Sequence, residues 1–382
     1  MVDLPRGTAR PGQRALLVEL DLGEGQVDDR LVELTELAVS AGAQVVGRVT
    51  GRRRRPDAAT FAGKGKVEEI GALCRDAGAD LVIFDHALSG VQQRNLENAL
   101  ECRVVDRTSL ILDIFAQRAR TREGKLQVEL AQLKHMSTRL VGGWTHLERQ
   151  RGGIGLRGPG ETQLETDRRL IAQRVRLVTE RLQGVAKSRA TQSRTRRRAE
   201  VRSVALVGYT NAGKSTLFNR LTGANVVAEN RLFATLDTTL RRVHVADGQT
   251  IVMSDTVGFI RDLPHDLVAA FRATLAEAAE ADLLLHVIDA SAADRDEQVI
   301  AVESVLAEIG AADVAQIRVL NKVDAAGLDA GVERDPCGTI TAVRVSALTG
   351  AGCAALRDAL AERFPLSPAR SQSLSPPARA AR

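Results

Sequence analysis

Aromatic side chains are scarce in this sequence, at 3% of its 382 residues. That scarcity disfavours a platform on which the bases of a single-stranded nucleic acid would stack. The sequence also lacks a run of 18 apolar residues, so we expect no membrane-spanning helix. Residues 1–14 are charged and contain Pro and Gly instead of an apolar stretch, so we expect no secretory signal peptide.

Cysteine and histidine are too few and too dispersed to indicate a metal centre. The four cysteines have no paired spacing, which favours free thiols in a reducing cytosol over zinc or iron–sulfur ligands. The six histidines show no ligand spacing, and we assign none of them to a metal. We therefore predict a cytoplasmic, monomeric protein, and a peripheral association with an anionic membrane surface stays open.

Positive charge is concentrated in one part of the sequence. Residues 118–202 hold 21 Lys and Arg against 8 Asp and Glu, a net charge of +13, whereas the whole chain carries +5. A basic segment inside an otherwise acidic protein indicates a polyanionic partner. Three consecutive arginines at 196–198 are its densest part, and we interpret them as a phosphate-backbone contact in preference to a solvated face.

The first part of the sequence, to residue 116, alternates strand and helix patterns. Apolar runs at 15–20, 44–49, 80–85 and 103–106 are typical of strands, and segments of helical periodicity separate them. We expect a small parallel sheet with helices packed on it. In the turn at 61–66, two glycines precede a helix start, which is compatible with an anion loop. Its spacing matches no phosphate signature, so we favour a basic surface loop.

The next part, residues 117–199, predicts a helical hairpin because apolar residues recur at alternating steps of four and three. Ser137 is the one polar residue in this repeat. The first seam contains Leu126, Leu130, Leu133, Leu140, Trp144 and Leu147, and the second contains Leu164, Ile171, Val175, Val178, Leu182 and Val185. Two such seams bury each other in an antiparallel coiled coil.

A glycine-rich segment at 151–160 separates the two helical patterns. Its five glycines and one proline cannot continue a helix, and it is longer than a hairpin turn requires. Apolar and basic side chains occur among the glycines, which favours a docking tip over a disordered linker. The predicted contact residues are Ile154, Gly155, Leu156 and Arg157.

An apolar run at 204–207, a glycine-rich loop and a helical pattern from 216 follow one another directly. This strand–loop–helix order is the context that a phosphate-binding loop requires. The loop residues are Gly208, Tyr209, Thr210, Asn211, Ala212, Gly213, Lys214 and Ser215. The glycines let backbone amides approach phosphate oxygens. Lys214 adds a cation at the β- and γ-phosphates, and the Ser215 hydroxyl is placed to bind Mg²⁺.

The second motif of such a site lies at the end of an apolar strand, where Mg²⁺ and the γ-phosphate would be sensed. It consists of Asp255, Thr256, Val257 and Gly258. Asp255 would hold Mg²⁺ through water, and the Gly258 amide would face a γ-phosphate. Phe259 follows, where many GTPases place a glutamine that orients the attacking water. A phenyl ring cannot donate or accept that hydrogen bond, so no catalytic residue is assigned and intrinsic hydrolysis should be slow.

Two later motifs identify the base as guanine. The first consists of Asn321, Lys322, Val323 and Asp324, and the second of Ser346, Ala347 and Leu348. Asp324 can accept from the N1–H and N2–H₂ groups of guanine, the Lys322 stem can cover the ring, and Asn321 can tie this loop to the phosphate loop. Amides of the second motif can reach guanine O6. Four motifs in order predict a domain that binds GTP and GDP.

The fold class expected is α/β. Residues 1–116 form an N-terminal α/β domain, 117–199 a helical hairpin, 200–365 a P-loop G domain, and 366–382 a tail whose composition predicts disorder.

With these residues laid out, the sequence resembles the HflX family, ribosome-binding GTPases of the Obg-related translational group. The matching residues are the glycine-rich stretch 152–167, Asp106, Arg107, Thr108, the stretch 114–119, and Phe233, Ala234, Thr235, Leu236 and Asp237. The resemblance runs from about residue 15 to 365. The sequence departs from the family at Thr238, where a proline is usual, and in lacking a longer C-terminal domain found in some relatives. Functions that depend on that domain are not carried over.

The resemblance implies a GTPase that acts on the large ribosomal subunit through ribosomal RNA and is associated with splitting or rescuing stalled ribosomes. It also links the N-terminal domain to ATP, and places residues 233–237 in the switch that meets GTP. Within that switch, Thr235 matches the family position of a Mg²⁺ ligand. Thr239 is the alternative, because it directly precedes the next strand. Ribosomal contact would then raise the rate of hydrolysis.

Two other function classes stay open on the sequence. One is a GTP-regulated factor for a non-ribosomal partner, such as a protein complex or an anionic membrane surface. The other is an RNA-remodelling ATPase driven by the N-terminal domain, in which the G domain is only regulatory.

Overall fold

The structure is a computed structural model that describes residues 12–23, 25–143, 159–198, 201–224, 226, 231–246, 248–264, 267 and 271–365. The chain forms two compact units. The first comprises residues 1–191, 229–237 and 260–274, and the second comprises 192–228, 238–259 and 275–382. Two segments of the predicted G domain therefore group with the N-terminal unit. The predicted tip residues 154–157 and the tail lie outside the described residues.

The first unit contains a four-stranded parallel sheet of order β2-β1-β3-β4. Its strands are β1 (Arg14–Asp21), β2 (Gln44–Arg52), β3 (Leu81–Phe84) and β4 (Arg103–Asp106). All four were predicted as apolar runs and are confirmed. Residues 15–20 of β1 are fully buried, as continuous apolar strands of parallel sheets are.

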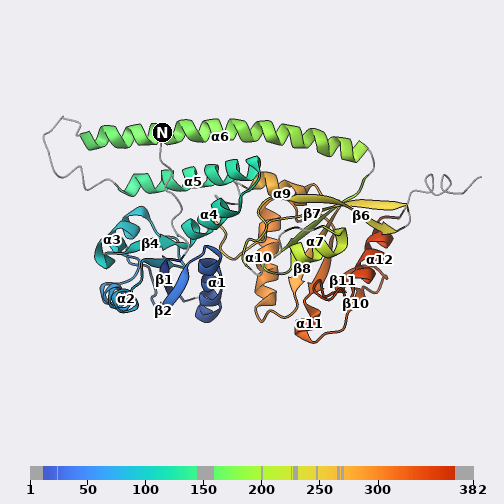
Figure 1. Cartoon of the computed structure of the whole chain (residues 1–382), viewed down its shortest axis with the longest axis horizontal. Helices are drawn as coiled ribbons and strands as arrows, with labels where there is room; N and C mark the ends of the chain where they lie inside the picture. The colour runs from blue at the N-terminus through green and yellow to red at the C-terminus, as the bar shows by residue number, and fades with distance from the viewer. Residues whose placement is uncertain are drawn as a thin grey trace, which may run out of the picture. The chain divides into compact units, whose positions relative to one another are not determined.

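Four helices accompany this sheet (Figure 1). They are α1 (Val27–Ser40), α2 (Lys64–Ala77), α3 (Gly90–Leu100) and α4 (Arg107–Arg118). Helices α2 and α3 contact each other, as do α1 and α4. Ser89 starts α3 with a capping box, since its hydroxyl accepts from the Gln92 amide while the Gln92 side chain accepts from the Ser89 amide.

The helical hairpin consists of α5 (Arg122–Gly143) and α6 (Pro159–Arg198), which lie side by side in Figure 1. Pro159 begins α6, a position where its missing N–H costs nothing. The predicted seam is confirmed in a buried cluster of Leu126, Leu130, Leu133, Ile171 and Val178, against which Met136, Val175 and Leu182 pack. Trp144 and Leu147 lie outside the described residues.

The second unit contains a seven-stranded sheet of order β10-β11-β9-β8-β5-β7-β6. The strands are β5 (Ser203–Gly208), β6 (Thr239–Ala246), β7 (Gln249–Asp255), β8 (Leu283–Asp289), β9 (Gln316–Asn321), β10 (Gly331–Arg334) and β11 (Ile340–Arg344). The edge pairs β6–β7 and β10–β11 are antiparallel, and the other pairs are parallel. Parallel strands bring their carboxyl ends to one edge, which is where α/β sheets bind ligands.

The helices that accompany these strands are α7 (Lys214–Thr222), α9 (Arg272–Ala279), α10 (Arg295–Glu308), α11 (Val323–Ala326) and α12 (Cys353–Arg363). Leu217, Phe218 and Leu221 of α7 join Leu356 and Leu360 of α12 in one buried core with residues of the sheet. This core fixes α7, and with it the loop that precedes it, against the strands. No described helix is both long and apolar enough to cross a membrane.

Candidate functional site

The loop between β5 and α7 needs glycine at both ends. Gly208 has φ +150°, and a β-carbon there would lie 2.2 Å from the carbonyl oxygen of Val287. Gly213 has φ +89°, and its β-carbon would lie 2.3 Å from Nδ2 of Asn321. A side chain at Gly208 would therefore clash with the backbone of β8, and one at Gly213 would displace the Asn321 side chain. The predicted phosphate-binding loop has the backbone that the sequence motif implies.

Lys214 is the first residue of α7 and is buried, with 6% of its surface exposed. Its Nζ donates to the carbonyl oxygens of Gly208 at 3.0 Å and Tyr209 at 2.7 Å. Burial lowers the pKa of Lys214 to about 8, and the charge of Asp255 partly offsets that effect. A buried cation with only neutral carbonyls as hydrogen-bond partners is suited to receive an anionic phosphate.

The predicted metal-binding residues Ser215 and Asp255 meet at the carboxyl ends of β5 and β7. The Ser215 hydroxyl donates to Oδ2 of Asp255 at 2.7 Å, and Asp255 is fully buried. A hydroxyl and a carboxylate at this distance form an all-oxygen donor set, which fits Mg²⁺. Thr256 is held beside them by a 2.6 Å hydrogen bond to the carbonyl of Leu206.

Gly258 and Phe259 continue from β7 along the phosphate-binding loop. A β-carbon on Gly258 would lie 2.8 Å from Cα of Thr210 and 3.0 Å from Nζ of Lys214, so the predicted γ-phosphate sensor lies against Lys214. The Phe259 backbone exchanges two hydrogen bonds with the loop, at 3.1 Å to Gly208 and 2.7 Å from Thr210. The Phe259 ring is fully buried, so it is part of the core and does not face an attacking water.

On the base side, Asn321 links the two loops as predicted. Its Nδ2 donates to the Ala212 carbonyl at 2.8 Å, and its Oδ1 accepts from the Ala347 amide at 2.9 Å. Lys322 forms a 2.6 Å ion pair with Asp289, a partner that the sequence gave no reason to expect. Although burial opposes it, the hydrogen bond from Lys322 lowers the pKa of Asp289. Asp324 lies in the single turn of α11.

The residues predicted for the switch lie in the first unit and contact its helices. Asp237 accepts from the amides of Arg120 at 2.8 Å and Thr121 at 2.9 Å, and from the Thr121 hydroxyl. The Phe233 ring meets Phe115 edge to face with centroids 4.7 Å apart. The structure thus holds the segment around Thr235 at both ends. Its approach to nucleotide stays a prediction.

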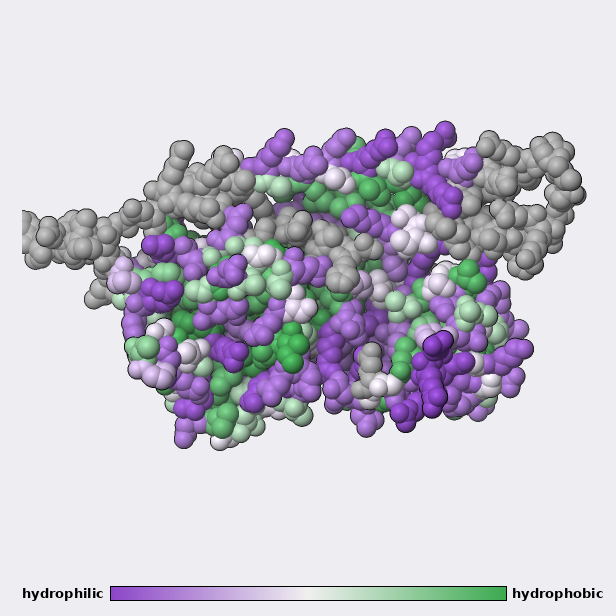
Figure 2. Space-filling model, turned by 180° about the vertical axis from the view of Figure 1, so that it is seen from behind, coloured by the Kyte–Doolittle hydropathy of each residue, from purple (hydrophilic) through white to green (hydrophobic). Residues whose placement is uncertain are grey.

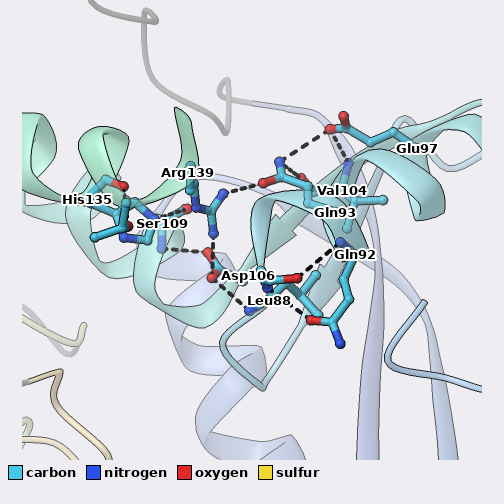
Figure 3. Close-up of polar contacts among 11 residues, drawn as sticks. Leu88, Gln92, Gln93, Glu97, Val104, Asp106, Ser109, His135 and Arg139 are labelled. Carbon is cyan, nitrogen blue, oxygen red and sulfur yellow. Dashed lines mark hydrogen bonds and ion pairs between the residues drawn. The ribbon is translucent and has the colours of Figure 1, made fainter. Parts of the chain in front are cut away.

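Asp106 and Arg107, which entered only through the family resemblance, prove to be structural anchors. Asp106 caps α4 by accepting from the Ser109 amide at 2.9 Å and also accepts from Arg139 of α5 at 2.6 Å, as Figure 3 shows. Arg107 pairs with Asp85 at 2.6 Å and with Glu33. Asp106 therefore ties the hairpin to the N-terminal sheet. Partners 33 residues apart leave no local sequence signal.

The turn at 61–66 is only in part the basic surface loop that was favoured, because Phe61 and Ala62 are buried in the core of the first unit and Lys64 begins α2. The Arg53 guanidinium lies 2.2 Å from the place where a β-carbon on Gly63 would be. Lys66 donates to the Thr50 carbonyl at 2.9 Å and pairs with Glu69 at 2.7 Å. ATP binding by the N-terminal domain stays a prediction.

These features define a P-loop guanine-nucleotide-binding protein in which a G domain follows an α/β domain and a helical hairpin. Three family models match, described as GTP-binding GTPase N-terminal at residues 28–116, GTP-binding GTPase Middle Region at 118–196, and 50S ribosome-binding GTPase at 203–322.

The chain is 55% identical to GTPase HflX of Escherichia coli K12 over 92% of its own length and 83% of that relative. It is 51% identical to GTPase HflX of Caldanaerobacter subterraneus subsp. tengcongensis over 83% of itself and 74% of the relative. The chain belongs to the HflX family, and it is a GTP-binding GTPase. A crystal structure of SsGBP with GDP has the same fold, with TM-score 0.51 and 22% identity over 94% of this chain and 100% of that one.

Proposed function

We propose that this GTPase binds the large ribosomal subunit through its helical hairpin and splits or rescues stalled ribosomes, hydrolysing GTP to GDP. One observation carries the proposal, namely a pair of helices packed through an apolar seam, in which α6 carries a row of exposed cations. The match of residues 203–322 to a family described as a 50S ribosome-binding GTPase supports the same partner.

The apolar seam of α6 packs against α5, and other positions of α6 carry exposed cations. Among the side chains of α6 that the structure describes, the exposed cations are Arg168, Arg169, Arg174, Arg176, Arg181 and Lys187. Figure 2 shows hydrophilic side chains along the outer side of this helix, with apolar side chains beneath them. A stiff rod of this charge suits the phosphates of folded ribosomal RNA, which would make binding dependent on salt.

The position of Phe259 supports the proposal that the ribosome stimulates hydrolysis. Its ring is buried in the core and its backbone is bonded to the phosphate-binding loop. No rotation of this side chain can orient a water beside a γ-phosphate. A partner must therefore supply or order the missing group, which makes the intrinsic rate slow.

In the proposed site, Ser215 and Thr235 would hold Mg²⁺ directly and Asp255 would hold it through water. The metal would supply positive charge at the β- and γ-phosphates. Thr239 is the weaker candidate, because it lies within the β6–β7 ladder opposite Asp255. A ligand that binds only in the GTP state needs a segment that can change conformation, and a residue paired in a ladder is less free to do so.

Sedimentation with purified large subunits tests the partner. We expect co-sedimentation with a non-hydrolysable GTP analogue, and much less with GDP or without nucleotide. Replacing Arg168, Arg169 and Arg176 by Ala should weaken binding and reduce its salt dependence. The exposed pair Arg241 and Arg242 of β6 provides a control, since Ala at both sites removes surface charge outside the hairpin. Equal losses in the two variants would contradict a specific role of α6.

The proposed contact residues of the tip are Ile154, Gly155, Leu156 and Arg157. Deleting residues 153–158 should leave nucleotide binding and slow intrinsic turnover unchanged, because the segment lies far from the G domain in sequence. The deletion should remove stimulation by large subunits and the splitting of ribosomes. If large subunits stimulate the deleted and intact proteins equally, the tip is only a linker.

The same experiments separate the alternatives. Binding to anionic vesicles, without binding to large subunits, would favour a GTP-regulated factor with a non-ribosomal target. ATP turnover that survives Lys214→Ala would favour an ATPase centred on the N-terminal domain.

A further inference from the structure

Arg220 lies on α7, six residues after Lys214, and reaches the guanine-side loop at residues 346–352. Its Nε donates to the carbonyl oxygen of Ala347 at 3.2 Å, and its Nη2 donates to that of Leu348. The guanidinium carbon also lies 3.6 Å from the place where a β-carbon on Gly350 would be. One side chain therefore joins the helix of the phosphate-binding loop to the loop predicted to read the base.

Three amides of this loop, those of Ser346, Ala347 and Thr349, donate to partners within the protein. The Ser346 amide donates to the Ala351 carbonyl at 2.9 Å, and the Ala347 amide donates to Asn321 at 2.9 Å. The Thr349 amide donates to the Ser346 hydroxyl at 3.1 Å. Of the three amides predicted to meet guanine O6, those of residues 346 and 347 already have partners inside the fold. This leaves the Leu348 amide as the predicted donor.

The direction of that amide depends on Arg220. The carbonyl of Ala347 and the N–H of Leu348 belong to one peptide unit, which is planar and trans, so the two groups point in opposite directions. A guanidinium that holds the oxygen of Ala347 therefore fixes where the Leu348 N–H points. The second bond, to the Leu348 carbonyl, fixes the following peptide unit in the same way.

We propose that Arg220 is a positioning residue for base recognition: it orients the Leu348 amide as the hydrogen-bond donor to guanine O6. This rests on the proposed guanine site. Arg220 contacts neither base nor phosphate in the proposal and acts only through two backbone carbonyls. Because α7 begins at Lys214, the same helix then aligns the phosphate-binding and base-binding sides of the nucleotide.

The test measures the affinities for GDP and 6-thio-GDP, in which sulfur, a weaker acceptor, replaces O6. Arg220→Ala removes two charge-assisted bonds that hold one amide, so we expect GDP affinity to fall about fivefold. Affinity for 6-thio-GDP should change less than twofold, so the preference for oxygen at C6 should shrink. Arg220→Lys keeps a donor and should restore part of that preference.

Two control variants make the outcomes distinguishable. Arg334→Ala removes an arginine of the same unit that pairs with Glu362 at the surface, and it should change neither affinity. Asp324→Asn tests the guanine site itself. If Asp324→Asn alters base preference while Arg220→Ala weakens both nucleotides equally or neither, Arg220 has no positioning role and the proposal is overturned. If neither variant changes base preference, the guanine assignment fails as well.

Discussion

The two sheets of this chain differ in what lies at the carboxyl ends of their parallel strands. In the second unit, glycine backbone and a buried lysine form the edge between β5 and β8. In the first unit, the corresponding place between β1 and β3 is filled by charged side chains. A hollow of about 380 Å³ remains there, lined by Glu19, Arg30, Asp85 and Arg107 among others. The carboxyl ends of the central strands thus carry the predicted phosphate-binding loop in one unit and an internal ion network in the other.

The difference follows from where charge is compensated. Arg107 is 5% exposed and is paired with Asp85 and Glu33, so its charge is neutralised within the fold. Although burial opposes it, these carboxylates raise the pKa of Arg107. Lys214 is buried to the same degree, but its hydrogen-bond partners are the neutral carbonyls of Gly208 and Tyr209. A buried cation with neutral partners at the edge of a sheet favours the binding of an anionic ligand. A buried cation that is paired with carboxylates contributes to the stability of the fold instead.

Of the changes that test this comparison, removal of Arg107 should have the largest effect on stability. Arg107→Leu removes the closest cation of the buried Asp85 and the partly buried Glu33, which should cost the first unit about 3–5 kcal/mol of stability. GDP affinity should stay within twofold of wild type, because this cluster has no part in the proposed nucleotide site. Chemical denaturation and GDP titration measure the two effects.

Arg334→Leu is the matched control for Arg107, since its pair with Glu362 is largely exposed. Its loss should cost much less stability than the loss of Arg107, because solvent screens a pair at the surface. If the two variants lose similar amounts of stability, the Arg107 cluster does not stabilise the first unit as an internal ion network.

The sequence predicted the residues of the second unit's edge better than those of the first, because only the former lie in local motifs. Lys214, Ser215 and Asp255 were predicted because each lies at a fixed place in a local motif, and the seam of the hairpin because its period is regular. The Arg107 cluster and Arg220 were not predicted. Glu33 and Arg107 are 74 residues apart, and Arg220 and Ala347 are 127 apart, so no local pattern joins them. The switch residues around Asp237 were predicted at the nucleotide. Their contacts with α4 and with the turn before α5 were not foreseen, because those partners are also far away in the sequence.

The next largest effect is expected on nucleotide affinity, from a change at the predicted guanine-binding site of the second unit. Asp324→Asn should lower GTP affinity about 100-fold, because two hydrogen bonds from guanine to a carboxylate are lost at roughly 1.5 kcal/mol each. Affinity for xanthosine triphosphate should rise, since its C2 oxygen can accept from the new amide. Titration with both nucleotides checks the exchange. An Asn variant that keeps full GTP affinity and gains none for the xanthine nucleotide would remove Asp324 from the site.

The two units should also respond to pH with opposite sign. Burial, followed by the charge of Asp85, raises the pKa of Glu19 to about 8, whereas Arg30 and Arg107 oppose that rise. His86 lies 3.7 Å from the same carboxyl group. The folded state then binds the extra proton between pH 4.5 and 8. The contribution of Glu19 to the stability of the first unit should be largest below pH 4.5. It should fall as pH rises toward 8, by at most about 1.4 kcal/mol per pH unit.

His286 of β8 behaves in the opposite way. Burial, aided by the charges of Arg318 and Lys214, lowers its pKa from 6.5 to about 4. The unfolded state then binds the extra proton between pH 4 and 6.5, so stability of the second unit falls as pH drops through that window. Denaturation from pH 5 to 8 should lose the first slope in Glu19→Gln and the second in His286→Leu. A variant that retains the wild-type profile shows that its residue does not set it.

The smallest expected effect concerns residues 233–237, the segment predicted to act as the switch. Thr235 lies between Phe233 and Asp237, both of which contact helices of the first unit, while its proposed role is to bind Mg²⁺ beside GTP. GDP lacks the γ-phosphate that would bring this segment to the metal, so Thr235→Ala should leave GDP affinity within twofold. GTP affinity should fall about tenfold, the size expected for one lost charge-assisted contact. Thr239→Ala is the control, because Thr239 pairs with Asp255 in the β6–β7 ladder and should affect both nucleotides alike. If Thr239→Ala selectively weakens GTP and Thr235→Ala does not, the ligand lies four residues further along, and the anchored segment has no direct part in sensing the γ-phosphate.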